Sequence, residues 1–384
     1  MVVQHNLRAM NSNRMLGITQ GTLAQSTEKL SSGYKINRAA DDAAGLSISE
    51  KMRKQIRGLT QASLNAEDGI SAVQTAEGAL TEVHDMLQRL NELAVKAANG
   101  TNSISDRQSI QDEVDQLLTE IDRVAETTKF NELYMLKGDA EKKTMQLNAH
   151  DAGIAGTLTQ GATNATFFMD KINYGDKIMI AGTEYHISAT VSEQTDVITN
   201  SVQVGQQVTI DGIVYTCTAA TVSNADKFEL TKDDLKAKID TNGLSVMTVN
   251  GKSYYGAKIA DEDKTVVSST AAYNLIKNEL ILASSVGADT AAEASIIGDG
   301  DTEVDDPQLK GKWVFEITKK ATVITRQAIN FNLHVGADAD MTNKIGVKID
   351  TLDTKGLGIQ GLNVKDMTGA AATYAIDAIA DAVA

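Results

Sequence analysis

The stretch before Phe130 combines apolar residues at helical spacing with a complete lack of proline, and this most constrains the fold. The only proline of the chain is Pro307, and proline is the residue least compatible with a helix interior. Leu16, Leu23 and Leu30 recur every seven residues, which is the repeat of helices that pack along one another. We therefore expect an N-terminal coiled-coil arm followed by further long helices.

Two more apolar seams follow the arm, and a short polar turn separates them. Both seams advance in steps of three and four, so each predicts one face of a helix. A turn at residues 100–103 (GTNS) then predicts two antiparallel helices. The first seam is Val73, Ala76, Leu80, Val83, Leu87 and Leu90, and the second is Ile110, Val114, Leu117, Ile121 and Val124.

Local signals refine the helix boundaries. Ser105 precedes Gln108 by three positions, the spacing of a capping box that satisfies free backbone N–H groups. The segment 31–45 (SSGYKINRAADDAAG) interrupts the heptads with glycines and paired aspartates. It is expected to connect the arm to the long helices.

The composition changes from about residue 175, where β-branched residues and glycine turns predominate. Three segments share alternating apolar residues, a residue–Gly pair and a tyrosine three positions after the glycine, a pattern typical of tight β-hairpins. These tyrosines are Tyr185, Tyr215 and Tyr254. Three related hairpins predict an inserted β-rich domain with the tyrosines in the hairpin cores.

The last part of the chain mixes several textures. FNLHVGADAD and KIGVKIDTL look extended, GLGIQGLNV is a glycine-rich turn region, and TYAIDAIADAVA has helical spacing. Ile376, Ile379 and Val383 begin an apolar face that no capping glycine ends, so the sequence is expected to stop inside a helix.

Composition and charge exclude several classes of function. The net charge is −15, which argues against nucleic-acid binding, because phosphate neutralisation needs clustered Lys and Arg. Residues 1–40 are the exception, with five basic side chains and one acidic; this basic arm suits contact with acidic neighbours, or it is simply a solvated face. No apolar run approaches the roughly 18 residues of a membrane span. The N-terminus also lacks the pattern of a cleaved secretory signal.

No residues suggest catalysis, a metal or a cofactor. Cys217 is the single cysteine, and the five histidines are scattered without metal-ligand spacing. The acidic run at 299–306 (DGDTEVDD) resembles a calcium loop, but it has Val304 where that loop needs glycine. We predict a protein that is not an enzyme and that uses no cofactor.

An apolar stripe on the first long helix requires a further partner. Met86, Leu90, Leu93 and Ala97 lie beside the main seam, and two helices alone cannot cover both stripes. The segment 375–384 is the intramolecular candidate, and neighbouring subunits are the candidate for the arm.

Three long stretches resemble bacterial flagellins: LSSGYKINRAADDAAGLSISEKMRKQIRGL at 30–59, NAEDGISAVQTAEGALTEVHDMLQRLNELAVKAANGTNS at 65–103 and QDEVDQLLTEIDRVAETTKFN at 111–131. GLGIQGLNV resembles the segment by which flagellins return from their variable insertion. The resemblance implies a subunit that polymerises into the flagellar filament for motility, is secreted by the flagellar type III apparatus, and works outside the cell. Its implied partners are further copies, an export chaperone, a cap protein and an innate Toll-like receptor.

The resemblance also implies roles for particular residues. In the family the apolar seam of the arm is buried between subunits, which assigns the heptad residues Leu16, Leu23 and Leu30 to subunit packing. The receptor-contacting positions correspond to Arg89, Leu93 and Glu113. From periodicity alone Leu93 would instead pack in the second stripe. Flagellins end with a long helix pair of which only the start is present, so a chain ending at Ala384 is expected to polymerise weakly or not at all.

The resulting prediction is an α+β multidomain protein made of long antiparallel helices with an inserted β-hairpin domain. We expect an arm and connector at 1–42, a helical rod at 43–174, a variable β-rich outer domain at 175–330, and a return segment with the start of a C-terminal rod helix at 331–384. Two alternatives stay open. One is a hook–filament junction protein, and the other is an adhesin or enzyme function in the outer domain, for which Trp313 and the three hairpin tyrosines are the candidate glycan-binding aromatics.

Overall fold

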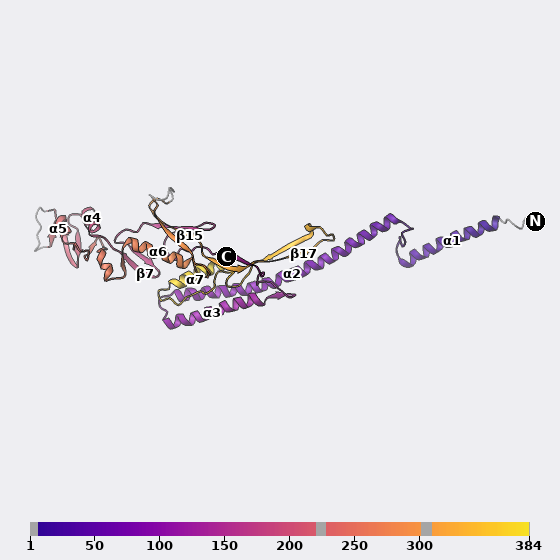
Figure 1. Cartoon of the computed structure of the whole chain (residues 1–384), viewed down its shortest axis with the longest axis horizontal. Helices are drawn as coiled ribbons and strands as arrows, with labels where there is room; N and C mark the ends of the chain where they lie inside the picture. Colours follow the sequence, from indigo (N-terminus) through magenta and orange to yellow (C-terminus); the bar gives the residue numbers. More distant parts are fainter. Residues whose placement is uncertain (1–6, 220–227, 301–308, 384) are drawn as a thin grey trace, which may run out of the picture. The chain divides into compact units, whose positions relative to one another are not determined.

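The computed structural model describes residues 7–219, 228–300 and 309–383 and falls into two units, each assembled from segments distant in sequence (Figure 1). The first unit comprises Met1–Val73 and Asn330–Lys348, and the second comprises Gln74–Ile329 and Ile349–Ala384. Long N-terminal helices precede a β-rich region, which confirms the predicted α+β fold class. The finer division into arm, rod, outer domain and return segment stays a prediction.

Three long helices open the chain, as the lack of proline predicts. They are α1 (Leu7–Ser32), α2 (Ala43–Ala98) and α3 (Ile104–Thr127). In the second unit, α3 runs beside the C-terminal part of α2 (Figure 1). The two are antiparallel: Arg107 near the start of α3 donates to the carbonyl oxygen of Ala97, 2.6 Å away, near the end of α2.

The cap of α3 differs from the predicted one. Ser103, and not Ser105, is the N-cap: its hydroxyl accepts from the Asp106 backbone N–H at 3.1 Å, and the Asp106 carboxylate accepts from the Ser103 N–H at 3.0 Å. The Ser103 hydroxyl also donates to the Asp106 carboxylate at 2.7 Å, and this bond, together with the one from the Ser103 N–H, lowers the pKa of Asp106. The prediction was wrong because the helix begins two residues earlier, and aspartate fills the reciprocal position as well as glutamine can.

A two-stranded sheet lies against α2 in the first unit. It pairs β17 (Ile329–His334) with β18 (Lys344–Ile349), and the turn η4 (Met341–Asn343) precedes β18. Gly69 of α2 makes the close approach possible, because a Cβ there would lie 2.1 Å from Leu333 Cδ1. The Asn65 side chain also donates to the His334 carbonyl at 2.9 Å.

Within the described residues, the second unit contains five sheets. β1 pairs with β2, β3 pairs with β16, and the larger sheets have the orders β14-β15-β5-β4, β13-β7-β6 and β10-β9-β8-β11-β12. The strand bounds in chain order are β1 (Lys129–Phe130), β2 (Leu133–Tyr134), β3 (Lys142–Gln146), β4 (Thr157–Gln160), β5 (Ala165–Asp170), β6 (Lys177–Ile180), β7 (Thr183–Ile187), β8 (Gln207–Ile210), β9 (Ile213–Cys217), β10 (Glu229–Leu230), β11 (Val246–Val249), β12 (Lys252–Tyr255), β13 (Val266–Val267), β14 (Glu293–Asp299), β15 (Lys312–Lys319) and β16 (Thr322–Arg326).

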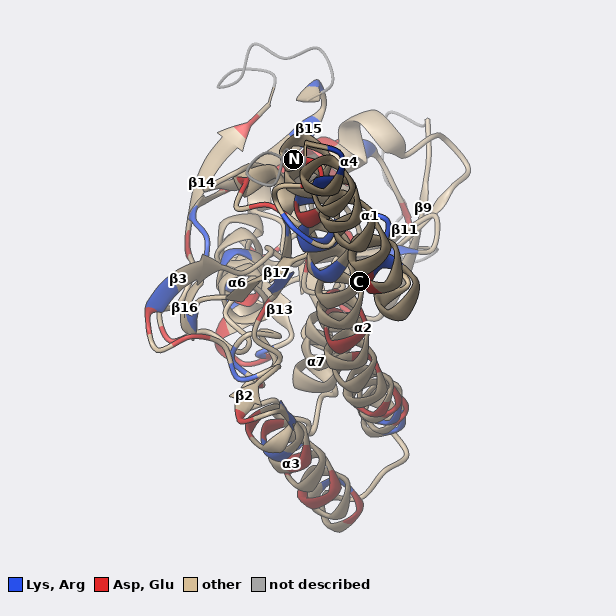
Figure 2. Cartoon of the chain, turned by 90° about the vertical axis from the view of Figure 1, so that its right-hand side faces the viewer, with Lys and Arg blue, Asp and Glu red and all other residues tan. Residues whose placement is uncertain are grey.

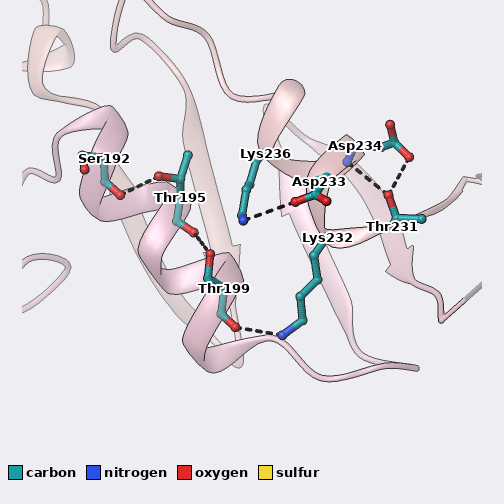
Figure 3. Close-up of polar contacts among 8 residues, drawn as sticks. All are labelled: Ser192, Thr195, Thr199, Thr231, Lys232, Asp233, Asp234 and Lys236. Carbon is teal, nitrogen blue, oxygen red and sulfur yellow. Dashed lines mark hydrogen bonds and ion pairs between the residues drawn. The ribbon is translucent and has the colours of Figure 1, made fainter. Parts of the chain in front are cut away.

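Shorter helices complete two apolar cores around these sheets. α6 (Ser269–Ala283) packs with strands β5, β6, β7 and β15, and α4 (Val191–Ser201) and α5 (Lys232–Ala237) pack with the five-stranded sheet. Figure 3 shows how α5 is tied to α4: Lys232 Nζ donates to the Thr199 carbonyl at 2.8 Å, and Thr231 caps α5. The turn η2 (Ala257–Asp261) follows β12.

The three predicted hairpins are all present and share one geometry. In each, the tyrosine pairs with the first apolar residue of the motif, as in Ile178 with Tyr185. Each turn places two successive residues at positive φ, and the second of them is glycine, the residue that adopts this conformation most readily. The turn pairs are Ala181–Gly182, Asp211–Gly212 and Asn250–Gly251.

The first two hairpins repeat each other's hydrogen bonds thirty positions apart. Gly175 N–H donates to the Ile187 carbonyl at 2.9 Å, and Gly205 N–H donates to the Cys217 carbonyl at 2.7 Å. Each hairpin then gains a short parallel strand, β13 on β7 and β10 on β9, followed by a helix. The second hairpin, with its parallel strand and helix, therefore repeats the arrangement of the first. In the sequence it is inserted between β7 and β13 of the first arrangement.

The C-terminal helix α7 (Ala370–Val383) returns to the helical core of the second unit. Ala372, Ala375, Ala378 and Ile379 of α7 share one apolar cluster with α2 and α3. This helix covers the second stripe of α2, as we expected.

Candidate functional site

Helix α1 carries large apolar side chains that nothing in the described chain buries. No residue of this 26-residue helix is buried, and Leu16, Leu23 and Leu30 are 55%, 66% and 85% exposed. Further exposed apolar residues on the same helix are Leu7, Met10, Met15 and Ile18. The three predicted subunit-packing leucines thus lie at the surface of the isolated chain.

The first half of α2 continues this character. Ile48, Met52, Ile56 and Leu59 are all more than half exposed, whereas Ala62 is buried. The first unit therefore presents large apolar side chains to solvent and buries small ones.

The helical core of the second unit holds most of the predicted rod-core residues. Val83, Leu87, Ile110, Val114 and Ile121 are buried in one cluster, and Leu117 packs partly buried against it. Leu90 and Leu93 of the second stripe belong to the same cluster.

Val73 and Leu80 do not belong to this core, which corrects the prediction. They are 41% and 40% exposed, whereas Ala72 and Ala76 are buried. On α2, buried positions recur about every seven residues toward the N-terminus and include Ala76. The small residues at these positions allow other segments to approach the helix closely. The prediction included Val73 and Leu80 because they are large and apolar, but they lie on the neighbouring face of the helix.

The predicted receptor-contacting residues separate into a surface pair and a core residue. Arg89 Nη2 and Nε lie 2.7 and 2.9 Å from Glu113 Oε1, and Arg89 Nη1 lies 2.9 Å from Glu92 Oε2. The bond to Glu113 raises the pKa of Arg89. Leu93 is only 1% exposed, so the expectation of an exposed apolar anchor was wrong; α7 and the return segment bury it.

In Figure 2 the ribbon of α3 carries several segments coloured for Asp and Glu. Glu120 is paired with Arg123 at 2.5 Å, and Gln108 donates to Asp112 at 2.6 Å. The outer face of α3 is therefore acidic and regularly hydrogen-bonded.

Three polar side chains of α3 hydrogen-bond to residues 351–366, the part of the return segment that precedes α7. The sequence did not predict these contacts. Arg107 is 2% exposed and donates to the carbonyls of Ala97, Asn99 and Asp366 at 2.6, 3.1 and 2.7 Å. The available signal was its spacing, because a charged residue three positions before Ile110 stands in phase with the apolar seam.

The other two residues act on the backbone of the same segment. The Gln111 amide donates to the Leu362 carbonyl and accepts from the Val364 N–H, both at 2.8 Å. Asp122 accepts from the Thr354 N–H at 2.8 Å. The segment 351–366 forms turns and irregular backbone and joins no sheet, and these side chains satisfy several of its backbone groups.

The described residues show no arrangement suited to metal chemistry. No group of three His, Cys, Asp or Glu side chains among them could hold a metal ion. Most of the calcium-loop-like run at 299–306 lies outside the described residues. Likewise, none of the helices in the described ranges has the length and apolar character that a membrane span requires.

The aromatic residues proposed for glycan binding are not gathered in one place. Tyr215 and Tyr254 are buried in one hairpin core, and Tyr185 packs partly buried in another cluster. Trp313 stacks on Tyr273 instead, with ring centroids 4.1 Å apart. The expectation that the repeat tyrosines are core residues is confirmed for Tyr215 and Tyr254, whereas Tyr185 is only partly buried.

These features define a class of protein with long N-terminal helices, an exposed apolar arm and an inserted β-rich region. Comparison with known proteins places it within that class. Residues 3–141 match the bacterial flagellin N-terminal helical region. A flagellin of Serratia marcescens is 36% identical over 73% of this chain and 75% of its own length.

Two further relatives match a smaller share of the chain. A flagellin of Clostridium tyrobutyricum is 52% identical over 42% of each chain. The flagellar filament 31.3 kDa core protein of Treponema maltophilum is 54% identical over 38% of this chain and 50% of its own. This chain thus spans about half the length of these two relatives.

The chain belongs to the bacterial flagellin family, as its long shared region with the Serratia protein shows. The predicted resemblance is confirmed. Members of this family are structural proteins of filaments, which also confirms the prediction that the chain is not an enzyme.

Proposed function

We propose that the chain is a structural subunit that polymerises into the flagellar filament. The observation that carries this proposal is α1, a helix of 26 residues with no buried residue. Its leucines at 16, 23 and 30 keep the seven-residue repeat of a helix that packs against another helix. The proposal assigns that missing partner to neighbouring copies.

Physical chemistry favours such a role for the arm. An isolated helix is marginally stable in water, because packing of its apolar face supplies most of the stability of protein helices. Each buried leucine contributes roughly 1.5–3 kcal/mol relative to the exposed state. Contacts between copies would stabilise α1 and bury its seam in the same step.

The family supports the wider setting of the proposal. One relative is named as a filament core protein, and filament subunits act outside the cell. We extend the proposal from the family to this chain in three further respects. The chain is exported through the flagellar type III apparatus, is assisted by a chaperone and a cap protein, and has a role in motility. The relatives' names favour a filament subunit over a hook–filament junction protein.

Self-association of the chain tests the proposal. We expect sedimentation velocity to show concentration-dependent association of the parent chain, and the double variant Leu16→Asp/Leu23→Asp to stay monomeric at the same concentrations. Hydrogen exchange should show α1 amides gaining protection as the parent associates.

A matched control separates the seam from added charge. Asn11 and Gln25 are exposed residues on the other side of the same helix, so Asn11→Asp/Gln25→Asp adds equal charge away from the three leucines. Association that persists in the leucine variant, or that is lost equally in both variants, would argue against the arm as the assembly surface.

We also propose recognition by an innate Toll-like receptor at the Arg89–Glu113 pair. The pair is exposed on the outer side of α2 and α3, with side-chain exposures of 50% and 42%. Arginine is frequent among residues that dominate binding energy at protein interfaces. Leu93 has no part in this proposal because it is buried.

A receptor-reporter assay checks this second proposal. Arg89→Ala should reduce receptor activation at least tenfold, since a central interface arginine often contributes more than about 1.4 kcal/mol. Arg123→Ala is the control, because Arg123 is also exposed and paired with a glutamate of its own helix. Equal potency of the Arg89 variant and the parent would contradict the proposal.

A further inference from the structure

A cavity of about 350 Å³ opens in the second unit at the N-terminal end of α6. It lies between this helix, the strands β14 and β15, and the segment 171–173. Its volume is within the range of small-molecule sites in proteins. The lining residues are Lys171, Ile172, Asn173, Ser269, Thr270, Tyr273, Ile296 and Trp313.

One wall of this cavity is a rigid aromatic pair. The rings of Trp313 and Tyr273 are stacked with an angle of 1° between their planes. The Tyr273 hydroxyl accepts from the Ile172 N–H at 2.8 Å, which fixes the tyrosine against the 171–173 segment. Burial raises the pKa of Tyr273, so this hydroxyl stays neutral.

The indole N–H of Trp313 lacks a hydrogen-bond acceptor among the described residues, although its Nε1 is buried. Buried donors in folded proteins are nearly always paired, and an unpaired one costs roughly 1–3 kcal/mol. A ligand or water with an acceptor near this wall would remove the penalty after a small local adjustment.

The two isoleucines of the lining extend the apolar wall, and the remaining lining residues are polar without excess charge. Ser269 and Thr270 bring hydroxyl groups, and Asn173 brings an amide. Lys171 is already paired with Asp299, with Nζ and Oδ1 2.6 Å apart. This pairing disfavours an anionic ligand, because the carboxylate neutralises the local cation.

We propose that this cavity binds a neutral saccharide unit. A sugar ring has apolar C–H faces, which suit the aromatic and isoleucine walls, and a rim of hydroxyl groups, which suit the serine, threonine, asparagine and lysine side chains. A purely apolar ligand would leave those polar groups unsatisfied. This binding site is additional to the proposed filament role and does not depend on it.

Fluorescence provides a direct probe, because Trp313 is the only tryptophan of the chain. Neutral hexoses and their disaccharides are titrated into the purified chain, with glucuronic acid and phenol as the anionic and apolar comparisons. We expect a saturable change in Trp313 emission with at least one neutral saccharide, and saturation-transfer NMR should show its ring protons in contact with the protein.

Thr270→Val tests the polar rim, since valine keeps the shape and removes the hydroxyl. We expect about five- to tenfold weaker binding, as for loss of one hydrogen bond. Thr199→Val is the control, because Thr199 is a helical threonine of α4 outside the cavity (Figure 3). A thermal unfolding curve of each variant shows whether its fold is intact.

Three outcomes would overturn the proposal. One is the absence of saturable binding by any neutral saccharide, and another is binding of glucuronic acid or phenol alone. The third is unchanged saccharide affinity in both Thr270→Val and a second rim variant, Asn173→Ala. Selective loss of affinity in these variants with full affinity in Thr199→Val supports it.

Discussion

Helices α1 and α3 have similar lengths, 26 and 24 residues, yet they differ completely in burial. α1 has no buried residue, whereas α3 buries seven, including Ile110, Val114 and Ile121. Both carry apolar residues at helical spacing. The difference shows that an apolar seam predicts a need for a partner but does not say whether the partner lies in the same chain.

The same contrast extends to polar residues. α3 uses Arg107, Gln111 and Asp122 to hold the return segment. Side-chain hydrogen bonds of α1 instead run mainly to its own backbone, as from Thr19 to Met15. α3 is therefore part of a folded core, whereas α1 packs against no core in the described chain.

The largest expected effect compares a leucine in each environment. Leu90→Ala removes a fully buried side chain from the α2–α3 core and should lower the free energy of unfolding by about 3 kcal/mol. Leu23→Ala on α1 should change it by less than about 0.5 kcal/mol. Urea unfolding of dilute chains followed by circular dichroism measures both, and similar losses would refute the contrast.

The buried arginine provides the next test. Arg107→Leu removes a buried donor from three carbonyls. The Asn99 and Asp366 carbonyls keep one backbone N–H donor each, at 3.3 and 3.4 Å, so a loss of about 2 kcal/mol is expected. Arg123→Leu, at an exposed pair on the same helix, should cost at most about 1 kcal/mol. A neutral effect of Arg107→Leu in chemical denaturation would show that these hydrogen bonds are dispensable.

The two serines at the start of α3 sharpen the comparison of predicted and observed caps. Ser103→Ala should destabilise the protein by about 1 kcal/mol, because the reciprocal bonds with Asp106 are lost. Ser105→Ala should have an effect within about 0.5 kcal/mol. Thermal unfolding distinguishes them, and the reverse order would favour the cap predicted from the sequence.

The smallest effect concerns pH and α7. Burial raises the pKa of Asp377, although nearby His150 opposes the shift. The folded state therefore prefers the protonated acid, so its stabilising contribution is present below the ordinary Asp pKa of about 3.9 and is lost as pH rises through the higher folded value.

Asp377→Asn should accordingly flatten the dependence of stability on pH above about pH 4. Unfolding in urea at several pH values measures this slope. Asp106→Asn is the opposing control: its pKa is lowered by Ser103, so its contribution is present at higher pH and lost as pH falls. Identical slopes in both variants would rule out the assigned signs.

Local patterns predicted much of the fold. The long helices followed from seams without proline, and the three hairpins followed from residue–Gly turns whose positive φ few other residues adopt. These features depend on neighbours within a few positions, so the sequence alone contains their cause.

Features that depend on distant segments were predicted less well. Val73 and Leu80 were assigned to the core because they are large, but the burial of Ala72 and Ala76 depends on which elements approach α2. Leu93 was expected to contact a receptor, yet the cluster it joins includes residues of α7. The stacking of Trp313 on Tyr273 joins residues of β15 and α6 and left no local signal.

The sequence by itself determined the helical N-terminus, the hairpin turns and the family, because periodicity, turn geometry and long shared stretches are properties of contiguous residues. Tertiary structure alone decided which seam is covered, which serine caps α3, how Arg107 holds the return segment, and where the cavity beside Trp313 forms. Burial and hydrogen bonding of these groups depend on atoms contributed by segments far apart in the chain.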